Sequence, residues 1–361
     1  MNICHIIESS GTGTLQMTIN IANSQAKKKN NQVYVIYSKR KSTPKDINQK
    51  FSKKVKLIYV DMQNLMRFFI FVNKIIYILN KIKPDFLFLH SSFAGAIGRL
   101  ASLFLKKEII IFYIPHAISF LNYVDFNIIK RSLFILIENI LNLKKAIYIA
   151  VTKSEMEGIK KRILFVKCEF IENSINIEKY FQKKILKKNL VIMVGEIRKK
   201  KGVDSFCNIA KKVMLHKKNT KFVWIGDGNN KLKKKLIDSN IEVTGWLDSK
   251  KVYKFFEDAA IYLTASKYEG MSISVLEALF FKSVVVAYAC EGHKDLLVNN
   301  STGFIFKNDH QATKIILMLL KNKKYLNKVA NRGYLLNKKK FDLKNFNNSY
   351  DKLIIKFHNE I

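Results

Sequence analysis

The sequence predicts an α/β protein made of two doubly wound parallel sheets. Three observations indicate this fold class. Short apolar runs rich in β-forming residues alternate with longer segments of helical period along the chain, which is typical of parallel sheets covered on both faces. A polar, lysine-rich stretch at 173–189 interrupts this alternation near the middle of the chain. The length of 361 residues is sufficient for two domains of ordinary size.

The first half contains short apolar runs with amphipathic segments between them. Strands are expected, in chain order, at 2–7, 32–38, 56–60, 86–89, 109–113 and 146–150. Helices are expected from near Leu15, at 62–82 and at 127–143, where apolar residues recur with helical spacing. We assign residues 1–175 to an N-terminal domain.

The second half repeats this organisation. Strands are expected at 190–195, 221–226, 241–245, 260–264, 283–287 and 303–306, and helices at 203–217, 230–239, 250–258 and 274–281. Residues 176–189 form the predicted linker, 190–340 the second domain, and 341–361 a C-terminal segment with one helix from about Leu343 to His358. Because open parallel sheets bind ligands outside the carboxyl ends of their strands, we expect a ligand cleft between the two domains.

Composition restricts the class of protein. The hydrophobic fraction is 48% and no apolar run approaches the ~20 residues of a membrane-spanning helix. The stretch from Ser132 to Leu143, for example, is interrupted by Glu138. Residues 2–7 run directly into a strand without a charged leader, so no signal peptide is expected. The four cysteines lack metal-ligand spacing, and reduced thiols in a cytoplasmic protein are the expected state.

The net charge of +36 suits an anionic partner. An anionic membrane surface is one such partner, which would make the protein peripheral on the inner face of the cell membrane. A compositional origin is the alternative, because only seven of the 64 basic residues are Arg and the lysines are spread along the whole chain. Nucleic acid is not expected as a partner, since no interleaving of aromatic and basic residues indicates such a module.

The most informative segment runs from Glu269 to Glu277. It reads as strand, Gly-containing turn, helix and next strand, with two carboxylates eight residues apart around the turn. Backbone N–H groups at a helix start face outward and bind anions such as phosphate. A phosphate site between two carboxylates that can accept hydrogen bonds from hydroxyl groups suits a sugar nucleotide. The alternative is a capping box from Ser274 to Glu277, in which Glu277 only satisfies a backbone N–H.

Two motifs of the first half also follow predicted strands. Gly11-Thr-Gly13 lies before the first helix, where small residues let the backbone approach a phosphate. It is not a dinucleotide fingerprint, because Gln16 stands where the third Gly belongs. His116 follows the fifth strand, where its ring could bind a substrate hydroxyl. A tight turn and a structural histidine remain the respective alternatives.

Two motifs of the second half are cationic or glycine-rich. Arg198 and Lys201 follow the strand at 190–195 and could neutralise a leaving diphosphate. Gly228 belongs to the turn Gly-Asp-Gly after the next strand and could approach a base or ribose. A solvated lysine run and an ordinary turn are the alternatives.

Together these motifs resemble those of the retaining GT-B glycosyltransferases of family 4, which include bacterial capsule and O-antigen enzymes. The resemblance covers nearly the whole chain. In the first half it rests on Ile-Ile-Glu-Ser-Ser-Gly-Thr-Gly and Pro-His-Ala-Ile-Ser-Phe-Leu. In the second half its motifs are Gly195…Lys201-Gly202, Gly226-Asp-Gly228, Gly245-Trp246, Glu269 to Glu277, and Thr302-Gly303. It implies the GT-B fold: two Rossmann-like domains facing across a cleft, with a C-terminal helix that crosses back to the first.

The resemblance implies roles for the motif residues. Glu269 would contact donor-sugar hydroxyls, Lys201 would meet the diphosphate, and His116 would line the donor-sugar and acceptor side. Arg198 would assist Lys201. The expected nucleotide-binding residues are Glu277 for the ribose, Gly270, Met271 and Ser272 for the diphosphate, Gly13 over the phosphates, and Gly228.

These residues predict a retaining glycosyltransferase that moves a sugar from a nucleotide-sugar, with UDP as the expected nucleotide, to a hydroxyl of a lipid-linked glycan precursor. No cofactor and no metal are expected. One departure matters: the family usually has Gly-Arg where this chain has Gly195-Glu196, and a carboxylate at that position would repel the donor. Arg198 could substitute. A catalytically silent GT-B subunit that scaffolds a partner enzyme is therefore the alternative, followed by a basic nucleic-acid-binding protein.

Overall fold

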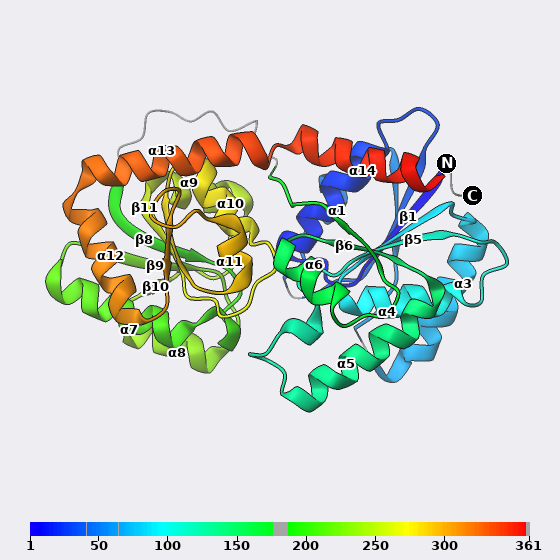
Figure 1. Cartoon of the computed structure of the whole chain (residues 1–361), viewed down its shortest axis with the longest axis horizontal. Coiled ribbons are helices and arrows are strands. Elements are labelled where there is room, and N and C mark those ends of the chain that lie inside the picture. Colours follow the sequence, from blue (N-terminus) through cyan, green and yellow to red (C-terminus); the bar gives the residue numbers. More distant parts are fainter. Residues whose placement is uncertain (41, 64, 176–186, 359–361) are drawn as a thin grey trace. The chain divides into compact units, whose positions relative to one another are not determined.

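The computed structural model describes residues 1–40, 42–63, 65–175 and 187–358 (Figure 1). The chain divides into two compact units, each of which we describe by itself. Unit 1 contains Met1–Asn173 and Leu343–Ile361, and unit 2 contains Ser174–Asp342. Most of the predicted linker, residues 176–186, lies outside the described part of the chain.

The sheet of unit 1 is parallel throughout, with the strand order β3-β2-β1-β4-β5-β6-β7. Its strands are β1 (Asn2–Ile7), β2 (Gln32–Tyr37), β3 (Val55–Tyr59), β4 (Phe86–His90), β5 (Ile110–Ile114), β6 (Ile147–Ala150) and β7 (Lys167–Phe170). The first six were predicted. The sequence did not predict β7, because it is an edge strand whose Lys167 and Glu169 remain accessible to water and give it no apolar pattern.

Helices cover both faces of this sheet. They are α1 (Thr12–Gln25), α2 (Ile47–Lys50), α3 (Phe68–Ile82), α4 (Ser92–Ser102), α5 (Ile128–Leu141), α6 (Lys153–Lys160) and α14 (Leu343–His358). The helix expected at 62–82 begins only at Phe68, because Met62 is buried in the preceding loop and residues 65–67 form a 3₁₀ turn. The aromatic rings of α14 pack on the sheet, as in the contact of Phe357 with Phe112.

The sheet of unit 2 is also parallel, in the order β10-β9-β8-β11-β12-β13. Its strands are β8 (Lys188–Val194), β9 (Lys221–Ile225), β10 (Glu242–Val243), β11 (Ala259–Thr264), β12 (Val284–Tyr288) and β13 (Phe304–Phe306). Its helices are α7 (Val203–His216), α8 (Asn230–Asp238), α9 (Ser249–Asp258), α10 (Ile273–Phe280), α11 (Glu291–Leu296), α12 (Asp309–Lys321) and α13 (Lys323–Lys340). The predicted fold class of two doubly wound parallel sheets is therefore confirmed.

Both strand orders reverse direction once, between β1 and β4 in unit 1 and between β8 and β11 in unit 2. Loops that leave the two strands at such a point diverge to opposite sides of the sheet and leave a crevice, where doubly wound sheets bind their ligands. The motifs selected from the sequence follow β1 and β5 in unit 1, and β8, β9 and β11 in unit 2. Among the described helices, none has the length and apolar character needed to cross a membrane.

Candidate active site

An ion pair between Lys201 and Glu269 forms the centre of the candidate site. Lys201 Nζ donates a hydrogen bond of 2.5 Å to Glu269 Oε1, and only 16% and 12% of the two side chains are exposed. Lys201 follows β8 and Glu269 follows β11, so the pair lies at the point where the strand order of unit 2 reverses. The structure thus brings together two site residues that are 68 positions apart in the sequence.

The conformation of Gly202 explains how Lys201 comes so close to Glu269. Its φ of 69° lies in the left-handed region, and a Cβ there would stand 2.1 Å from the carbonyl oxygen of Ala265. Only glycine allows the turn of Lys199–Lys201 to pack this tightly against the end of β11. The amide of Lys267 donates 2.9 Å to the carbonyl of Lys200 and joins the two loops.

Glu269 is held in its charged form. Burial raises the pKa of this carboxyl, but the positive charges of Lys201, Lys200 and His293 outweigh burial and lower the pKa to about 2. An ionised carboxylate has only acceptor atoms, so it suits a ligand that presents hydroxyl groups. Lys201 occupies one of its oxygens, which leaves acceptor capacity on the other.

The turn formed by Gly270, Met271 and Ser272 leads into α10. Ser272 is the N-cap residue, yet its side chain makes no capping hydrogen bond. The neighbouring helices α8 and α9, by contrast, are capped by the side chains of Asn229 and Asp248. The first N–H groups of α10 therefore receive no cap from this side chain, which is the arrangement that binds anions.

Glu277 lies one turn into α10. The capping-box alternative is wrong, because Ser274 is inside the helix and not at its N-cap. Burial raises the pKa of Glu277 to about 8, against the opposite effect of a hydrogen bond with Tyr253. The carboxyl therefore carries a proton at neutral pH in the absence of a ligand.

His293 joins the site although the sequence did not single it out. It lies on α11, is fully buried, and its Nδ1 is 2.8 Å from the carbonyl oxygen of Tyr288 and 3.2 Å from Cys290 Sγ. Burial lowers the pKa of the ring, but Cys290 and the charge of Glu269 raise it overall. Its Nε2 is buried and has no hydrogen-bond partner among the described residues. The available signal was its position just after β12, the neighbour of β11.

The backbone turn at Glu269 and Gly270 packs directly against α11. A Cβ on Gly292 would lie 2.1 Å from the carbonyl oxygen of Gly270 and 2.5 Å from that of Glu269. Glycine is thus required at this position by close packing, and the contact fixes the turn at Glu269 and Gly270 relative to His293.

Arg198 and Gly228 occupy the rim of the unit 2 site. Arg198 Nη1 lies 3.6 Å from Glu196 Oε2, and both side chains are about half exposed, at 47% and 48%. Arg198 thus offsets the carboxylate that departs from the family pattern. Gly228 bridges to Ile197, and the amide of Ile197 donates 2.9 Å to the carbonyl of Asp227. Gly228 therefore lets the backbone of its turn approach the loop after β8.

His116 in unit 1 ends a buried chain of imidazole rings. His5 Nε2 is 2.7 Å from Gln25 Oε1, His5 Nδ1 is 3.0 Å from His90 Nε2, and His90 Nδ1 is 3.3 Å from His116 Nε2. Burial lowers the pKa of His5 and of His116 to about 4, and lowers the pKa of His90 as well. All three rings are thus neutral at pH 7.

Neutral imidazole carries one N–H and one lone pair, so the chain has a direction. With Oε1 of Gln25 as the final acceptor, His5 donates from Nε2, His90 donates from Nε2 to His5, and His116 donates from Nε2 to His90. This order leaves Nδ1 of His116 as an acceptor. Sequence reasoning found His116 but missed His5 and His90, which lie inside apolar strands.

The turn after β5 that carries His116 is itself held in place. The amides of Ala117 and Ile118 donate 3.1 Å and 2.9 Å to Glu155 Oε1, and His116 adopts a φ of 56°. Gly13 also belongs to unit 1, in the first turn of α1, which starts at Thr12 and not near Leu15. Its N-cap Gly11 has no side chain to cap the helix.

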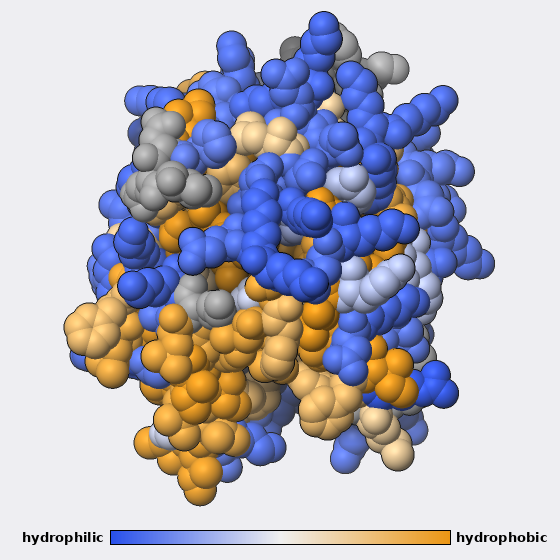
Figure 2. Space-filling view, turned by 90° about the vertical axis from the view of Figure 1, so that its right-hand side faces the viewer, coloured by the Kyte–Doolittle hydropathy of each residue, from blue (hydrophilic) through white to orange (hydrophobic). Residues whose placement is uncertain are grey.

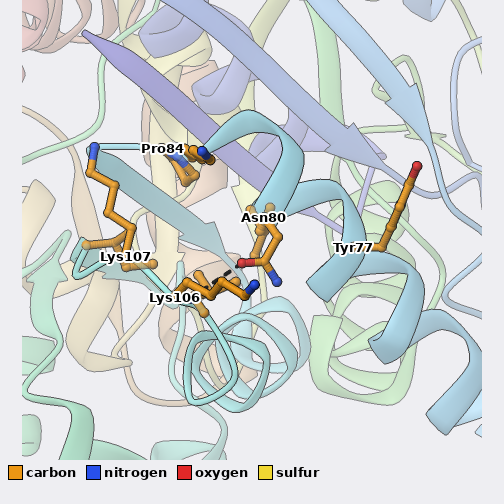
Figure 3. Close-up of a pocket in the computed structure, with 9 residues that line it drawn as sticks. Tyr77, Asn80, Pro84, Lys106 and Lys107 are labelled. Atoms are coloured by element: carbon orange, nitrogen blue, oxygen red, sulfur yellow. Dashed lines mark hydrogen bonds between the residues drawn. The ribbon is translucent and has the colours of Figure 1, made fainter.

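A cavity of about 690 Å³ lies elsewhere in unit 1 (Figure 3). It is lined by the end of α3 with Tyr77 and Asn80, by Pro84, and by Lys106 and Lys107 before β5. These residues precede β4 and β5, so the cavity is at the amino ends of the strands. The motif residues all follow strands, and the cavity is therefore separate from the candidate site.

Known proteins resemble this chain in sequence and in fold. Residues 176–336 match the family described as glycosyl transferases group 1. An uncharacterized 41.2 kDa protein in the cps region of Klebsiella pneumoniae is 27% identical over 252 residues, which cover 65% of this chain and 68% of that protein. The amylovoran biosynthesis glycosyltransferase AmsD of Erwinia amylovora is 28% identical over 127 residues, 33% of this chain and 34% of its own length.

The crystal structure of Anabaena Alr3699/HepE in complex with UDP and glucose superimposes with a TM-score of 0.83 and 14% identity, covering 99% of this chain and 100% of that one. At this identity the likeness shows the fold, which is that of a GT-B protein. The predicted GT-B fold is confirmed, and residues 176–336, slightly less than half of the chain, match the glycosyl transferases group 1 family.

Proposed function

We propose that the protein transfers a sugar from a UDP-sugar to a hydroxyl of a lipid-linked glycan precursor, with retention at the anomeric carbon and without a metal. The observation that carries this proposal is the Lys201–Glu269 pair beside the start of α10, which the side chain of Ser272 does not cap. It combines a cation and the backbone amides at a helix start, which can bind a diphosphate, with a carboxylate for sugar hydroxyls. The complex of HepE with UDP and glucose and the cps-region relative support the donor class and the pathway.

In this proposal the bond between the anomeric carbon and the phosphate oxygen breaks while the acceptor oxygen forms a new bond to that carbon. Lys201, Arg198 and the amides of 270–272 stabilise the negative charge of the departing diphosphate, which is the main electrostatic task. The acceptor proton passes to an oxygen of that diphosphate. We favour this route over a covalent intermediate, because the candidate carboxylate Glu269 is ion-paired to Lys201.

A donor screen tests the proposal directly. The full chain is incubated with each nucleotide-sugar and a lipid-linked acceptor, with and without anionic vesicles, and released nucleoside diphosphate is measured. Release that depends on the acceptor with one donor is the expected result. If calorimetry shows no binding of any donor, the protein is instead a catalytically silent subunit.

The raised pKa of Glu277 predicts a pH-dependent stability. The carboxyl has its ordinary pKa of 4.5 in the unfolded chain and about 8 in the folded one. Between these values the folded state binds more protons, so stability falls as pH rises and the full loss is present above pH 8. Glu277→Gln removes this loss and is expected to raise Tm at about pH 9 but not at about pH 5.

The affinity for UDP is expected to increase with pH, whereas the stability of the fold decreases. If the ribose hydroxyls donate to ionised Glu277, the affinity for UDP should increase as pH rises through about 8, and Glu277→Gln should bind UDP more weakly without this increase. Calorimetric titrations at several pH values measure both. An unchanged affinity in Glu277→Gln would remove Glu277 from the nucleotide site.

The histidine chain predicts that His90 positions His116. His90→Phe keeps a ring of similar size between His5 and His116, but it removes both hydrogen bonds. We expect kcat to fall about tenfold with little change in KM for the donor, because His116 loses its fixed tautomer. The acid limb of the pH–rate profile should also move. His310→Phe, at an exposed position on α12, is the control. A wild-type kcat in His90→Phe would contradict the role.

A further inference from the structure

Helix α5 of unit 1 packs Phe134 and Ile135 against the core but leaves many of its apolar side chains exposed. The buried side chain of this helix is that of Glu138, while a row of large apolar side chains is exposed to water. The exposed residues are Ile128, Ile129, Leu133, Leu136, Ile137 and Ile140. Apolar patches of this kind on a folded chain mark an interaction surface. Figure 2 shows apolar side chains gathered on the lower part of the face that it presents.

The orientation of α5 is fixed from the inside. Glu138 Oε2 accepts hydrogen bonds from Arg99 Nη2 at 2.7 Å and from the Tyr148 hydroxyl at 2.8 Å, and Oε1 accepts one from Tyr113 at 3.0 Å. Arg99 comes from α4 and its side chain is fully buried. Rotating α5 to bury its isoleucines would expose this network, so the apolar face stays outside.

A neighbouring turn extends the apolar face. The side chain of Asn139 on α5 donates 3.0 Å to the carbonyl of Arg162 and accepts 2.8 Å from the amide of Leu164. This contact places the turn beside the helix. Leu164 is 69% exposed and Phe165 is completely exposed, with a φ of 50° that L-residues rarely adopt. The fold thus holds a bare phenyl ring outward in a strained backbone conformation.

The other side of α5 continues the same surface. Helix α4 packs against both α5 and α3, so the three helices form one layer. Large exposed apolar residues of this part of the layer are Phe69, Ile70 and Tyr77 on α3, and Leu103 and Phe104 after α4. The amide of Lys106 is 3.5 Å from Asn80 Oδ1, which joins the segment after α4 to α3.

Cations surround these apolar residues. The segments 68–83, 103–109, 128–145 and 160–167 form the layer and its edges, and we call their outer face the α5 surface. Its exposed basic residues are Lys74, Lys81, Lys83, Lys106, Lys107, Lys130, Lys145, Lys160 and Lys161, of which Lys107 pairs with Asp85. Among the described side chains of these segments, Glu108 is the exposed acid. The surface therefore combines apolar area with a strongly positive border.

We propose that the α5 surface docks onto an anionic lipid bilayer, with the apolar side chains of α5 and of the 164–165 turn inserted between headgroups. Apolar insertion bordered by lysines that meet anionic headgroups is the chemistry of interfacial membrane binding. The positive border favours a lipid surface over a second copy of this chain, whose own border would repel it. This inference deepens the proposed function, because it brings the enzyme to a lipid-linked acceptor.

The test uses the full chain and sedimentation with vesicles, without donor or acceptor. Wild type is expected to bind vesicles containing phosphatidylglycerol and not vesicles of phosphatidylcholine alone. Ile129→Glu/Leu136→Glu should weaken this binding at least about tenfold, because each substitution removes apolar area and adds repulsion. The matched control is Leu215→Glu/Ile237→Glu, which changes exposed apolar residues of unit 2 and should bind like wild type.

Two measurements complete the test. Far-UV circular dichroism and Tm check that the variants are folded, and UDP titration, which reports on unit 2, should be unchanged in both. Equal vesicle binding by wild type and the α5 variant would overturn the proposal. The proposal would also be overturned if wild type formed an oligomer and the α5 variant were monomeric but still bound vesicles. The α5 surface would then be an interface between two copies of the chain. If wild type bound vesicles but did not bind UDP, the result would count against the proposed function and not against the docking surface.

Discussion

Glu269→Gln is expected to lower kcat/KM for sugar transfer by about 10²- to 10³-fold while the protein remains folded. The substitution keeps the volume of the side chain but removes the negative charge that faces Lys201 at 2.5 Å. The sugar hydroxyls then lose an ionised acceptor, and the ammonium group of Lys201 is no longer held between β8 and β11. The rate of nucleoside diphosphate release at several donor concentrations measures the effect.

Controls separate this site effect from a general change of charge. Glu291→Gln, in the same unit, removes a carboxylate that is 67% exposed and paired to Lys294, and transfer should be unaffected. Lys201→Met alone should also be severely impaired. Because the two residues are in contact, the double variant should lose less than the product of the two single effects. Full activity in Glu269→Gln would refute the site.

Arg99→Met should destabilise unit 1 by about 3–5 kcal/mol, the usual effect of removing one partner of a buried ion pair. The guanidinium group stacks 4.4 Å from the ring centre of Tyr113 and also donates 2.6 Å to the Tyr148 hydroxyl. Its loss leaves Glu138 buried without a countercharge. Denaturant unfolding followed by circular dichroism measures the change.

Tryptophan fluorescence provides an internal control. Both tryptophans, Trp224 and Trp246, belong to unit 2, so their signal reports on that unit. Arg332→Met removes an exposed arginine of α13 and should change stability by less than about 0.5 kcal/mol. Arg99→Met/Glu138→Leu should recover much of the loss, because an apolar pair replaces the uncompensated charge. An Arg99→Met variant as stable as wild type would show that the network does not hold α5.

The sequence was sufficient for most strands and for the turn at Glu269, because both are local patterns. Apolar runs in parallel sheets are nearly continuous, and a strand, a Gly-containing turn and a helix in succession can be recognised without a partner. The edge strand β7 was missed because its charged residues interrupt the apolar run that marks the other strands. The start of α3 was misplaced, because burial of Met62 is a tertiary contact.

The candidate site was only partly accessible to sequence reasoning. Glu269 and Lys201 were each selected, but their contact depends on the strand order of unit 2 and on the close packing of Gly202 against Ala265. His90 and His293 were overlooked, because a single histidine carries no pattern. Their importance comes from neighbours that are distant in sequence, as in the hydrogen bond between His5 and His90. The charged state of Glu269 likewise depends on surrounding cations that folding gathers.

The division of unit 1 between the two ends of the chain has a consequence for biosynthesis. Helix α14 contributes Tyr350 and Phe357 to the packing on the sheet, and Asp351 pairs with Lys28 at 2.7 Å. During translation the ribosome completes all of unit 2 before it releases this helix. The first sheet therefore emerges from the exit tunnel with part of one face uncovered, and this part stays uncovered until α14 has been synthesised.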